Sequence, residues 1–189
     1  MARKTKNSMR AAVAVASMGA AGLASAASDI ATIQQGQGYV GLYGGIFTVK
    51  DSADRRAEPN HVAFRAGTFL IDQVAAEVEV GTGFNRDDIS PGTEVEMDHY
   101  VNASLVGHLP LGEKSSVYAK AGFADASINV HDSAGENSTS ENGFSYGFGL
   151  AAHPTEKMSL AIEYSELVDG DSFKADMVSI GIQSHFSLF

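Results

Sequence analysis

The amino-acid sequence predicts an all-β fold: a transmembrane, antiparallel, up-and-down β-barrel of about eight strands. Apolar residues alternate with small or polar ones in eight segments, which is the period of a strand with one apolar face. The connections between these segments are alternately short and long. After residue 27 no apolar run approaches the roughly 18 residues of a membrane-crossing helix.

Residues 1–26 are predicted to be a secretory signal peptide, which leaves 27–189 as one outer-membrane β-barrel domain. A basic stretch, an apolar stretch from Ala11 to Leu23 and the small residues Ala24-Ser25-Ala26 follow one another as in signal-peptidase substrates. The alternative is an N-terminal anchor helix. The 13 residues from Ala11 to Leu23 are fewer than the roughly 20 that cross a bilayer.

The charge balance limits the function classes. Without residues 1–26 the chain carries 9 basic and 23 acidic residues. This balance argues against nucleic-acid binding, which depends on Lys and Arg contacts to phosphate, and against a polybasic membrane-surface protein. The absence of cysteine fits an exported protein that folds without disulfides.

Each predicted strand has one apolar face. The segments are 9 to 13 residues long, which suits tilted membrane-crossing strands. The strands, with residues of their apolar faces, are 38–49 (Val40, Leu42, Ile46), 61–70 (Val62, Phe64, Leu70), 74–84 (Val74, Val78, Val80), 99–109 (Val101, Leu105, Leu109), 116–128 (Val117, Ala119, Phe123), 143–152 (Phe144, Phe148, Leu150), 158–166 (Met158, Leu160, Ile162) and 176–186 (Val178, Ile180, Ile182).

The lengths of the connections favour a membrane barrel over a soluble β-sandwich, which also shows alternation. Outer-membrane barrels have short periplasmic turns and long outer loops, and a sandwich has no reason to sort its connections in this way. Short turns are predicted at 71–73, 110–115 and 153–157, and long polar loops at 50–60, 85–98, 129–142 and 167–173.

Charged residues stand at mid-strand on the faces opposite to the apolar ones. The interior of a small barrel is polar and filled by side chains, and buried charges need partners. We therefore expect a charge network in the barrel lumen in which two bases pair with three acids. Its members are Arg65, Glu77, Glu79, Lys120 and Glu163.

Several strands resemble those of the small outer-membrane barrels of the OmpA/OmpX type. The resemblance covers nearly the whole of 27–189 and implies location in the outer membrane, contact with its lipid and lipopolysaccharide, insertion by the barrel-assembly machinery, and a monomer. The similar segments are Gly38-Tyr39-Val40-Gly41-Leu42, Arg65-Ala66-Gly67 with Ala75-Ala76-Glu77, Tyr118-Ala119-Lys120-Ala121-Gly122, and Ser145-Tyr146-Gly147-Phe148-Gly149.

The resemblance also implies a C-terminal aromatic residue that serves as an assembly signal. The stretch from Ser179 to Phe186 resembles such an ending, but the chain continues to Phe189. Either Phe186 or Phe189 can be the signal. Because the chain has no Trp, an aromatic girdle must use Tyr and Phe; the candidates are Phe64, Tyr146, Phe148, Tyr164 and Phe186.

Two short motifs suggest enzymatic or nucleotide-binding alternatives. Gly36 to Gly41 matches G-x-G-x-x-G, but a dinucleotide site needs a preceding strand and a following helix. His185 and Ser187 lie two apart, as in the His-x-Ser pair of outer-membrane lipid A deacylases. This pair falls at the predicted periplasmic end of its strand. We therefore predict no catalytic residues and no enzymatic activity.

No metal or other cofactor is predicted. The loop 85–98 contains several acidic residues that could bind Ca²⁺ or Mg²⁺, but their spacing matches no EF-hand. His61, His99 and His131 are each expected near the outer rim. Scattered surface histidines and a solvated acidic loop are the simpler interpretations.

Three function classes follow from the sequence. The leading one is a non-enzymatic barrel that supports the envelope or presents its loops for adhesion-like surface interaction. The second is a narrow pore, which is disfavoured because eight strands leave an interior filled by side chains. The third is a lipid A-modifying enzyme.

Overall fold

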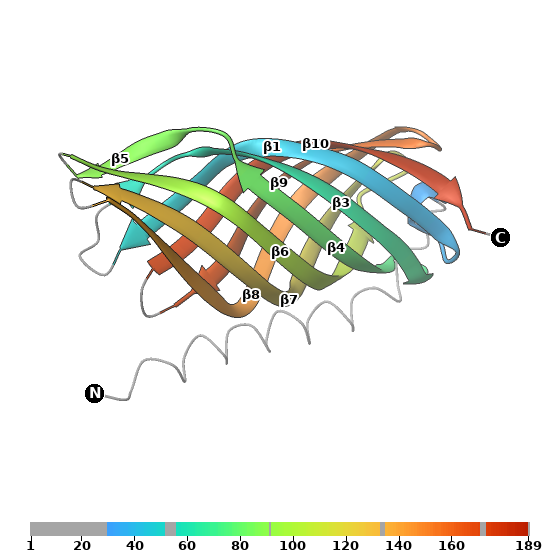
Figure 1. The fold of residues 1–189 in the computed structure, drawn as a ribbon. Helices are drawn as coiled ribbons and strands as arrows, with labels where there is room; N and C mark the ends of the chain where they lie inside the picture. The colour runs from blue at the N-terminus through green and yellow to red at the C-terminus, as the bar shows by residue number, and fades with distance from the viewer. Residues whose placement is uncertain (1–29, 52–55, 91, 133–134, 171–172, 189) are drawn as a thin grey trace.

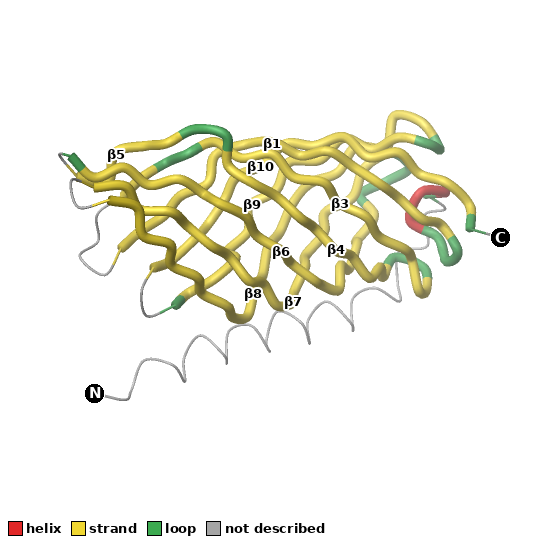
Figure 2. The backbone as a smooth tube through the Cα atoms, viewed as in Figure 1, coloured by secondary structure: helices red, strands yellow, loops and turns green. Residues whose placement is uncertain are grey.

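The computed structural model describes residues 30–51, 56–90, 92–132, 135–170 and 173–188, which form a closed antiparallel β-barrel (Figure 1). The predicted fold class is thereby confirmed. The predicted signal peptide and Phe189 lie outside the described residues. Figure 2 shows that nearly all of the described chain is strand.

Eight long strands of the described chain form the barrel wall, and each pairs antiparallel with its sequence neighbour. The first and last strands close the wall along their whole length, from Gln37↔Ser187 to Asp51↔Phe173. The wall strands are β1 (Gln37–Asp51), β3 (Asn60–Ile71), β4 (Val74–Gly83), β6 (Thr93–Pro110), β7 (Ser115–Asp132), β8 (Gly135–Thr155), β9 (Met158–Asp169) and β10 (Phe173–Ser187).

Three short elements complete the described structure. β2 (Arg56–Ala57) pairs with β1, and β5 (Arg86–Ser90) pairs with β6. A 3₁₀ turn, η2 (Ala31–Ile33), precedes the first strand. Among the described residues, no helix is long and apolar enough to span a membrane.

The alternation in the sequence separates the two faces of the wall. Outward-facing apolar side chains are exposed, with Phe123 at 71% and Ile180 at 69%. In a protein without a membrane such exposure would be unfavourable, whereas a lipid-facing belt requires it. The belt includes Leu42, Phe64, Val78, Leu105, Phe123, Phe144, Phe148, Leu150, Ile162, Ile180 and Ile182.

Short turns join the strands at one end of the barrel and place the C-terminal end there (Figure 1). The turn between β3 and β4 is tight because Gln73 adopts a left-handed conformation with φ of 69°. Since outer-membrane barrels place their short turns in the periplasm, this end is taken as periplasmic and the end near β5 as outer.

The prediction of long loops at 85–98 and 129–142 is wrong in part, because much of each range is strand. β5 and the first residues of β6 form a hairpin, and the β7–β8 hairpin continues to Asp132↔Gly135. The reason is visible in the residues: Val95, Met97 and Ile128 are buried inside, between polar neighbours that point outward. Alternation therefore continues beyond the lipid belt. We call β5 and the outer ends of β6, β7 and β8 (86–98, 124–132 and 135–143) the protruding sheet.

Buried side chains fill the lumen in three layers. An outer apolar layer lies inside the protruding end, a charge layer lies at mid-barrel, and a histidine layer lies at the periplasmic end. The outer apolar layer contains Phe47, Val95, Met97, Ile128, Leu167, Phe173 and Met177. The charge layer contains Arg65, Glu77, Glu79, Lys120 and Glu163, and the histidine layer contains His108, Ser116, His153, Ser159 and His185.

Candidate functional site

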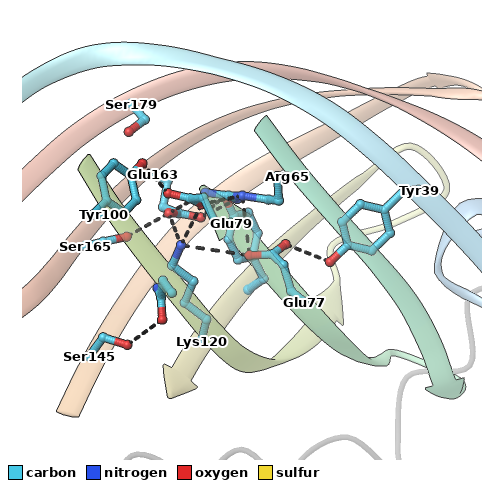
Figure 3. Close-up of polar contacts among 12 residues, drawn as sticks. Tyr39, Arg65, Glu77, Glu79, Tyr100, Lys120, Ser145, Glu163, Ser165 and Ser179 are labelled. Atoms are coloured by element: carbon cyan, nitrogen blue, oxygen red, sulfur yellow. Dashed lines mark hydrogen bonds and ion pairs between the residues drawn. The ribbon is translucent and has the colours of Figure 1, made fainter. Parts of the chain in front are cut away.

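Arg65 is the centre of the charge layer. Its Nη1 and Nη2 donate to the two carboxylate oxygens of Glu163 at 2.9 and 3.0 Å, and its Nε donates to Glu79 Oε2 at 2.6 Å. Glu77 Oε1 lies 3.3 Å from the same Nε. Figure 3 shows these side chains converging from different strands. The guanidinium thus contacts all three carboxylates of the layer.

Lys120 is the second cation of the layer. Its Nζ lies 2.6 Å from Glu163 Oε1, 3.4 Å from Glu79 Oε2 and 3.9 Å from Glu77 Oε1. Two cations and three carboxylates give the charge layer a formal charge of −1. Glu77 has the longest ion-pair distances of the three acids.

Three tyrosine hydroxyls complete the hydrogen bonding of the carboxylates, one for each glutamate; Figure 3 shows two of them, Tyr39 and Tyr100. A fourth, Tyr43, places its ring 3.7 Å from the Arg65 guanidinium carbon, a cation–π contact. The hydroxyl donors are Tyr39 to Glu77 at 2.7 Å, Tyr100 to Glu79 at 2.6 Å and Tyr118 to Glu163 at 2.9 Å.

Glycines on neighbouring strands make room for these rings. A Cβ atom at any of four positions would overlap a tyrosine ring, so the strand can hold only glycine where a ring crosses it. The pairs are Gly67 with Tyr39, Gly181 with Tyr43, Gly81 with Tyr100, and Gly149 with Tyr118. Each glycine therefore fixes the direction of one tyrosine.

The histidine layer is a chain of alternating rings and hydroxyls. Ser116 Oγ lies 3.1 Å from His108 Nδ1 and 3.0 Å from His153 Nε2. Ser159 Oγ lies 2.8 Å from His153 Nδ1 and 2.7 Å from His185 Nε2. All five residues are buried. The chain links β6, β7, β8, β9 and β10 across the periplasmic end of the lumen.

The structure brings the five charged residues proposed from the sequence into one cluster, since their alternation put each on the inward face. Sequence reasoning missed the four tyrosines and the histidine layer. The signal existed, because Tyr39, Tyr118 and His108 stand on the same inward positions as the charges. The sequence does not show the tilt of the strands, which brings residues that are far apart in the chain to the same height in the lumen.

The candidate catalytic residues give a substrate little access to a reactive group. His185 contacts Ser159 rather than forming an isolated pair with Ser187, and both His185 and Ser159 are buried in the lumen. A nucleophile needs access as well as a base. The Gly36–Gly41 motif leads into β1, so the helix that a dinucleotide site requires does not follow it.

The histidines considered for a metal site lie apart. His61 is buried and its Nε2 lies 3.1 Å from Ser179 Oγ, so its expected place on the rim surface is wrong: as an odd-numbered residue of β3 it shares the inward face with Arg65. His99 lies beside Asp98, and His131 Nε2 lies 3.7 Å from Glu96. Within the described ranges, no three His, Asp or Glu residues form a group that could hold a metal ion.

Of the two candidate assembly signals, Phe186 is described and points outward with 44% exposure, and Phe189 lies outside the described residues. Four of the proposed girdle residues, Phe64, Tyr146, Phe148 and Phe186, are also exposed on the outer wall. Phe148 packs against Tyr164 at a ring distance of 5.5 Å.

A closed barrel with an apolar belt and a polar, filled lumen defines a transmembrane barrel of the outer-membrane class. The chain matches the model of the outer membrane protein beta-barrel domain family over residues 11–186. It therefore belongs to this family and is an outer-membrane protein. No curated protein matches the sequence.

Solved structures share the fold at low sequence identity. Neisserial surface protein A aligns with a TM-score of 0.65 at 15% identity, covering 80% of this chain and 100% of that one. Ail, the attachment invasion locus protein of Yersinia pestis, aligns with a TM-score of 0.63 at 14% identity, covering 81% and 100%. The N-terminal barrel domain of Pseudomonas aeruginosa OprF gives 0.60 at 18%, covering 80% and 98%.

Proposed function

We propose that the protein is a non-enzymatic outer-membrane barrel whose protruding sheet contacts molecules at the cell surface. The observation behind this proposal is that the sheet extends past the lipid belt while the lumen beneath it is filled. A role that depends on transport or catalysis would need an open lumen or an accessible site. A role in surface contact needs a rigid, solvent-exposed platform.

The outer face of the protruding sheet is polar. The cross-strand pair Phe123↔Phe144 ends the lipid belt on β7 and β8. Beyond it the outward positions are polar and include the pairs Asp125↔Asn142 and Asn129↔Ser138. This change from aromatic to polar pairs marks where the wall leaves the hydrocarbon.

The ladder between β7 and β8 is longer than the ladder between β8 and β9. β9 pairs with β8 from Tyr146↔Glu166 onward, whereas β8 pairs with β7 from Gly135. The outer part of β8 thus extends beyond the end of its ladder with β9. Together with β7 it lengthens the surface that the protruding sheet offers to a partner.

The charge of the protruding sheet indicates the kind of partner that it binds. On the described part of β5 and the outer half of β6, five acidic residues stand with Arg86: Asp87, Asp88, Glu94, Glu96 and Asp98. Ail has been solved with the heparin analogue sucrose octasulfate. An acidic sheet repels such a polyanion, so we propose a cationic partner here.

A binding experiment tests this proposal. The full barrel in detergent micelles is passed over immobilised poly-lysine and immobilised heparin at low salt. A matched variant carries Asp88→Asn, Glu94→Gln and Asp98→Asn, which neutralises three exposed acids of this sheet and leaves the lipid-crossing strands intact. We expect the wild-type chain to bind poly-lysine and not heparin, and the neutralised variant to bind poly-lysine several-fold more weakly. Equal binding by both forms would refute a role of the sheet.

Two further measurements address the alternatives. Because the lumen is filled, we expect no stepwise conductance in planar bilayers; steady channels would favour the narrow pore. Mass spectrometry of lipid A from cells with and without the protein should give identical species. A lost acyl chain would favour an enzyme and direct attention to His185 and Ser187.

We also propose contacts with lipopolysaccharide, assembly by the barrel-assembly machinery through Phe186 or Phe189, and a monomeric state. The closed wall supports the monomer, since β1 and β10 pair along their whole length and leave no edge within the lipid belt. A single species of monomeric mass in nanodiscs is the expected result.

A further inference from the structure

The N-terminal segment 30–36 is packed into the periplasmic mouth of the lumen, beside the C-terminal end of β10 (Figure 2, red). Ile30, Thr32 and Ile33 are almost fully buried. The carbonyl of Ile33 accepts from the Gln73 amide at 2.8 Å, and the Gly36 amide donates to the Phe69 carbonyl at 3.2 Å. The segment therefore covers this end of the barrel.

A side-chain contact joins this segment to the histidine layer. Thr32 Oγ1 lies 2.9 Å from His153 Nδ1, the same nitrogen that faces Ser159. The backbone amides of the three layer histidines are themselves fixed to the periplasmic turns. His108 donates to the Gln73 carbonyl at 2.7 Å, His153 to Lys114 at 2.8 Å and His185 to Lys157 at 2.9 Å.

The groups around the three rings are mainly uncharged. Tyr118 of β7 stacks on His108 at 5.1 Å, Phe69 of β3 lies 5.6 Å from it, and Tyr39 of β1 lies 5.7 Å from His185. The hydroxyls of the two tyrosines point to Glu163 and Glu77 in the charge layer. The buried residues two positions along the same inward faces are Val106, Ala151, Ala161 and Gln183.

Ionisable groups of the turns lie at the rim. Asp72, Glu113, Lys114, Glu156 and Lys157 are all exposed. No carboxylate of the described residues forms an ion pair with His108, His153 or His185. A positive charge on these rings would thus have no directly bonded counterion.

Burial and mutual repulsion limit how many protons the three rings can take up in the closed layer. Each serine lies between two ring nitrogens, and one hydroxyl can donate to one of them and accept from the other. With three neutral rings, or with one ring protonated, all four ring–serine bonds can form. Two protonated rings would place two positive charges in a buried layer, where neighbouring rings are separated by a single hydroxyl, so mutual repulsion adds to the cost of burying the charge.

We propose that the histidine layer is an acid-sensitive latch that holds segment 30–36 in the periplasmic mouth and releases it on acidification. Rings exposed to water after release titrate near pH 6.5, so the open state can take up three protons. The closed layer is buried and has no carboxylate paired with its rings, so it disfavours more than one proton. Linkage then favours opening by up to about a hundredfold per pH unit below that value. The charge layer stays in place, so release exposes the segment without opening a pore.

Thiol labelling tests the latch, because the chain has no cysteine of its own. Ile33→Cys reports on the buried segment, and Leu111→Cys, on a periplasmic turn at a position that is 53% exposed, corrects for the pH dependence of the reagent. Both are labelled with a methanethiosulfonate in detergent micelles at pH 7.5 and pH 5. We expect the rate ratio of Ile33→Cys to Leu111→Cys to rise at least tenfold at pH 5.

Two further variants, each combined with the cysteine substitutions, show which histidine causes the rise in labelling rate. His153→Gln keeps a polar side chain that cannot take up a proton and should abolish most of the rise. His99→Gln removes an exposed histidine of the outer rim and should leave the rise unchanged. Gel mobility at pH 5 must show that the barrel is still folded. An unchanged ratio, an equal rise in His153→Gln, or global unfolding would overturn the proposal.

Hydrogen exchange of the cysteine-free chain provides a second readout in case Ile33→Cys itself loosens the segment. Protection of 30–36, corrected for intrinsic exchange rates, should fall at least tenfold between pH 7.5 and pH 5. The protection of β3 and β4 at mid-barrel should persist. Retained protection of 30–36 at pH 5 would refute the latch independently of any labelling result.

Discussion

Replacing Arg65 by Met should strongly destabilise the barrel. The guanidinium donates three hydrogen bonds of 2.6 to 3.0 Å to Glu79 and Glu163 and lies 3.3 Å from Glu77. After the change, three buried carboxylates share one cation, Lys120. Removing one partner of a buried ion pair costs about 3–5 kcal/mol. We expect a loss of about 4 kcal/mol, which is nearly a thousandfold in the folding equilibrium.

The assay must suit a chain without Trp. Urea titration of the barrel in lipid vesicles, followed by the gel mobility of folded and unfolded forms, gives the free energy of unfolding. The matched control is Arg86→Met on β5, whose partner Glu96 lies 3.1 Å away and whose side chain is 51% exposed. That change should cost less than about 1 kcal/mol.

A double variant separates the effect of the charge imbalance from the other effects of losing Arg65. In Arg65→Met/Glu163→Gln the uncompensated charge is reduced, while the amide that replaces the Glu163 carboxylate can still accept from Tyr118. The double variant should be more stable than Arg65→Met alone by about 1–3 kcal/mol. A loss for Arg65→Met no larger than that of the Arg86→Met control, or strictly additive effects in the double variant, would refute the reasoning.

Three further predictions concern single positions. Glu77→Ala should lower the melting temperature, because Tyr39 loses its acceptor, while Glu77→Gln should do so much less; equal melting temperatures for Glu77→Ala and wild type would contradict this. Phe148→Arg on the lipid face should cost about 2–4 kcal/mol, whereas Asn142→Arg on the same strand above the belt should cost little in the same titration. Phe186→Ala should reduce the folded, heat-modifiable fraction in cell envelopes if Phe186 is the assembly signal, and leave it unchanged if Phe189 is.

The fold could be predicted because alternation is a local property. A strand that faces lipid on one side and a filled lumen on the other shows this pattern within ten residues, as in Val117 to Phe123. The outer limits of the strands could not be predicted as well. In Glu94-Val95-Glu96-Met97-Asp98 the alternation continues, but its polar members are acidic and indicate a loop by composition.

For the candidate site, the sequence predicted which face of its strand each residue occupies, but not which residues are in contact. The sequence puts Arg65, Lys120 and Glu163 on inward positions, but their mutual distances depend on the stagger between strands. That stagger is set by closure of the wall, a property of all eight strands together. The histidine layer was missed for the same reason, since His108, His153 and His185 lie on three strands with no common motif.

The charge layer has a consequence for register as well as for stability. Buried ion pairs seldom stabilise a protein more than well-packed apolar residues would. Stability alone therefore does not explain why the lumen contains a charge layer. Arg65 on β3 meets Glu79 on β4 directly across the ladder, but meets Glu163 only through the stagger of the closed wall. A slip of one residue in any of these strands would turn a charge toward lipid. The charge layer therefore disfavours a one-residue slip more strongly than an apolar lumen of equal volume would.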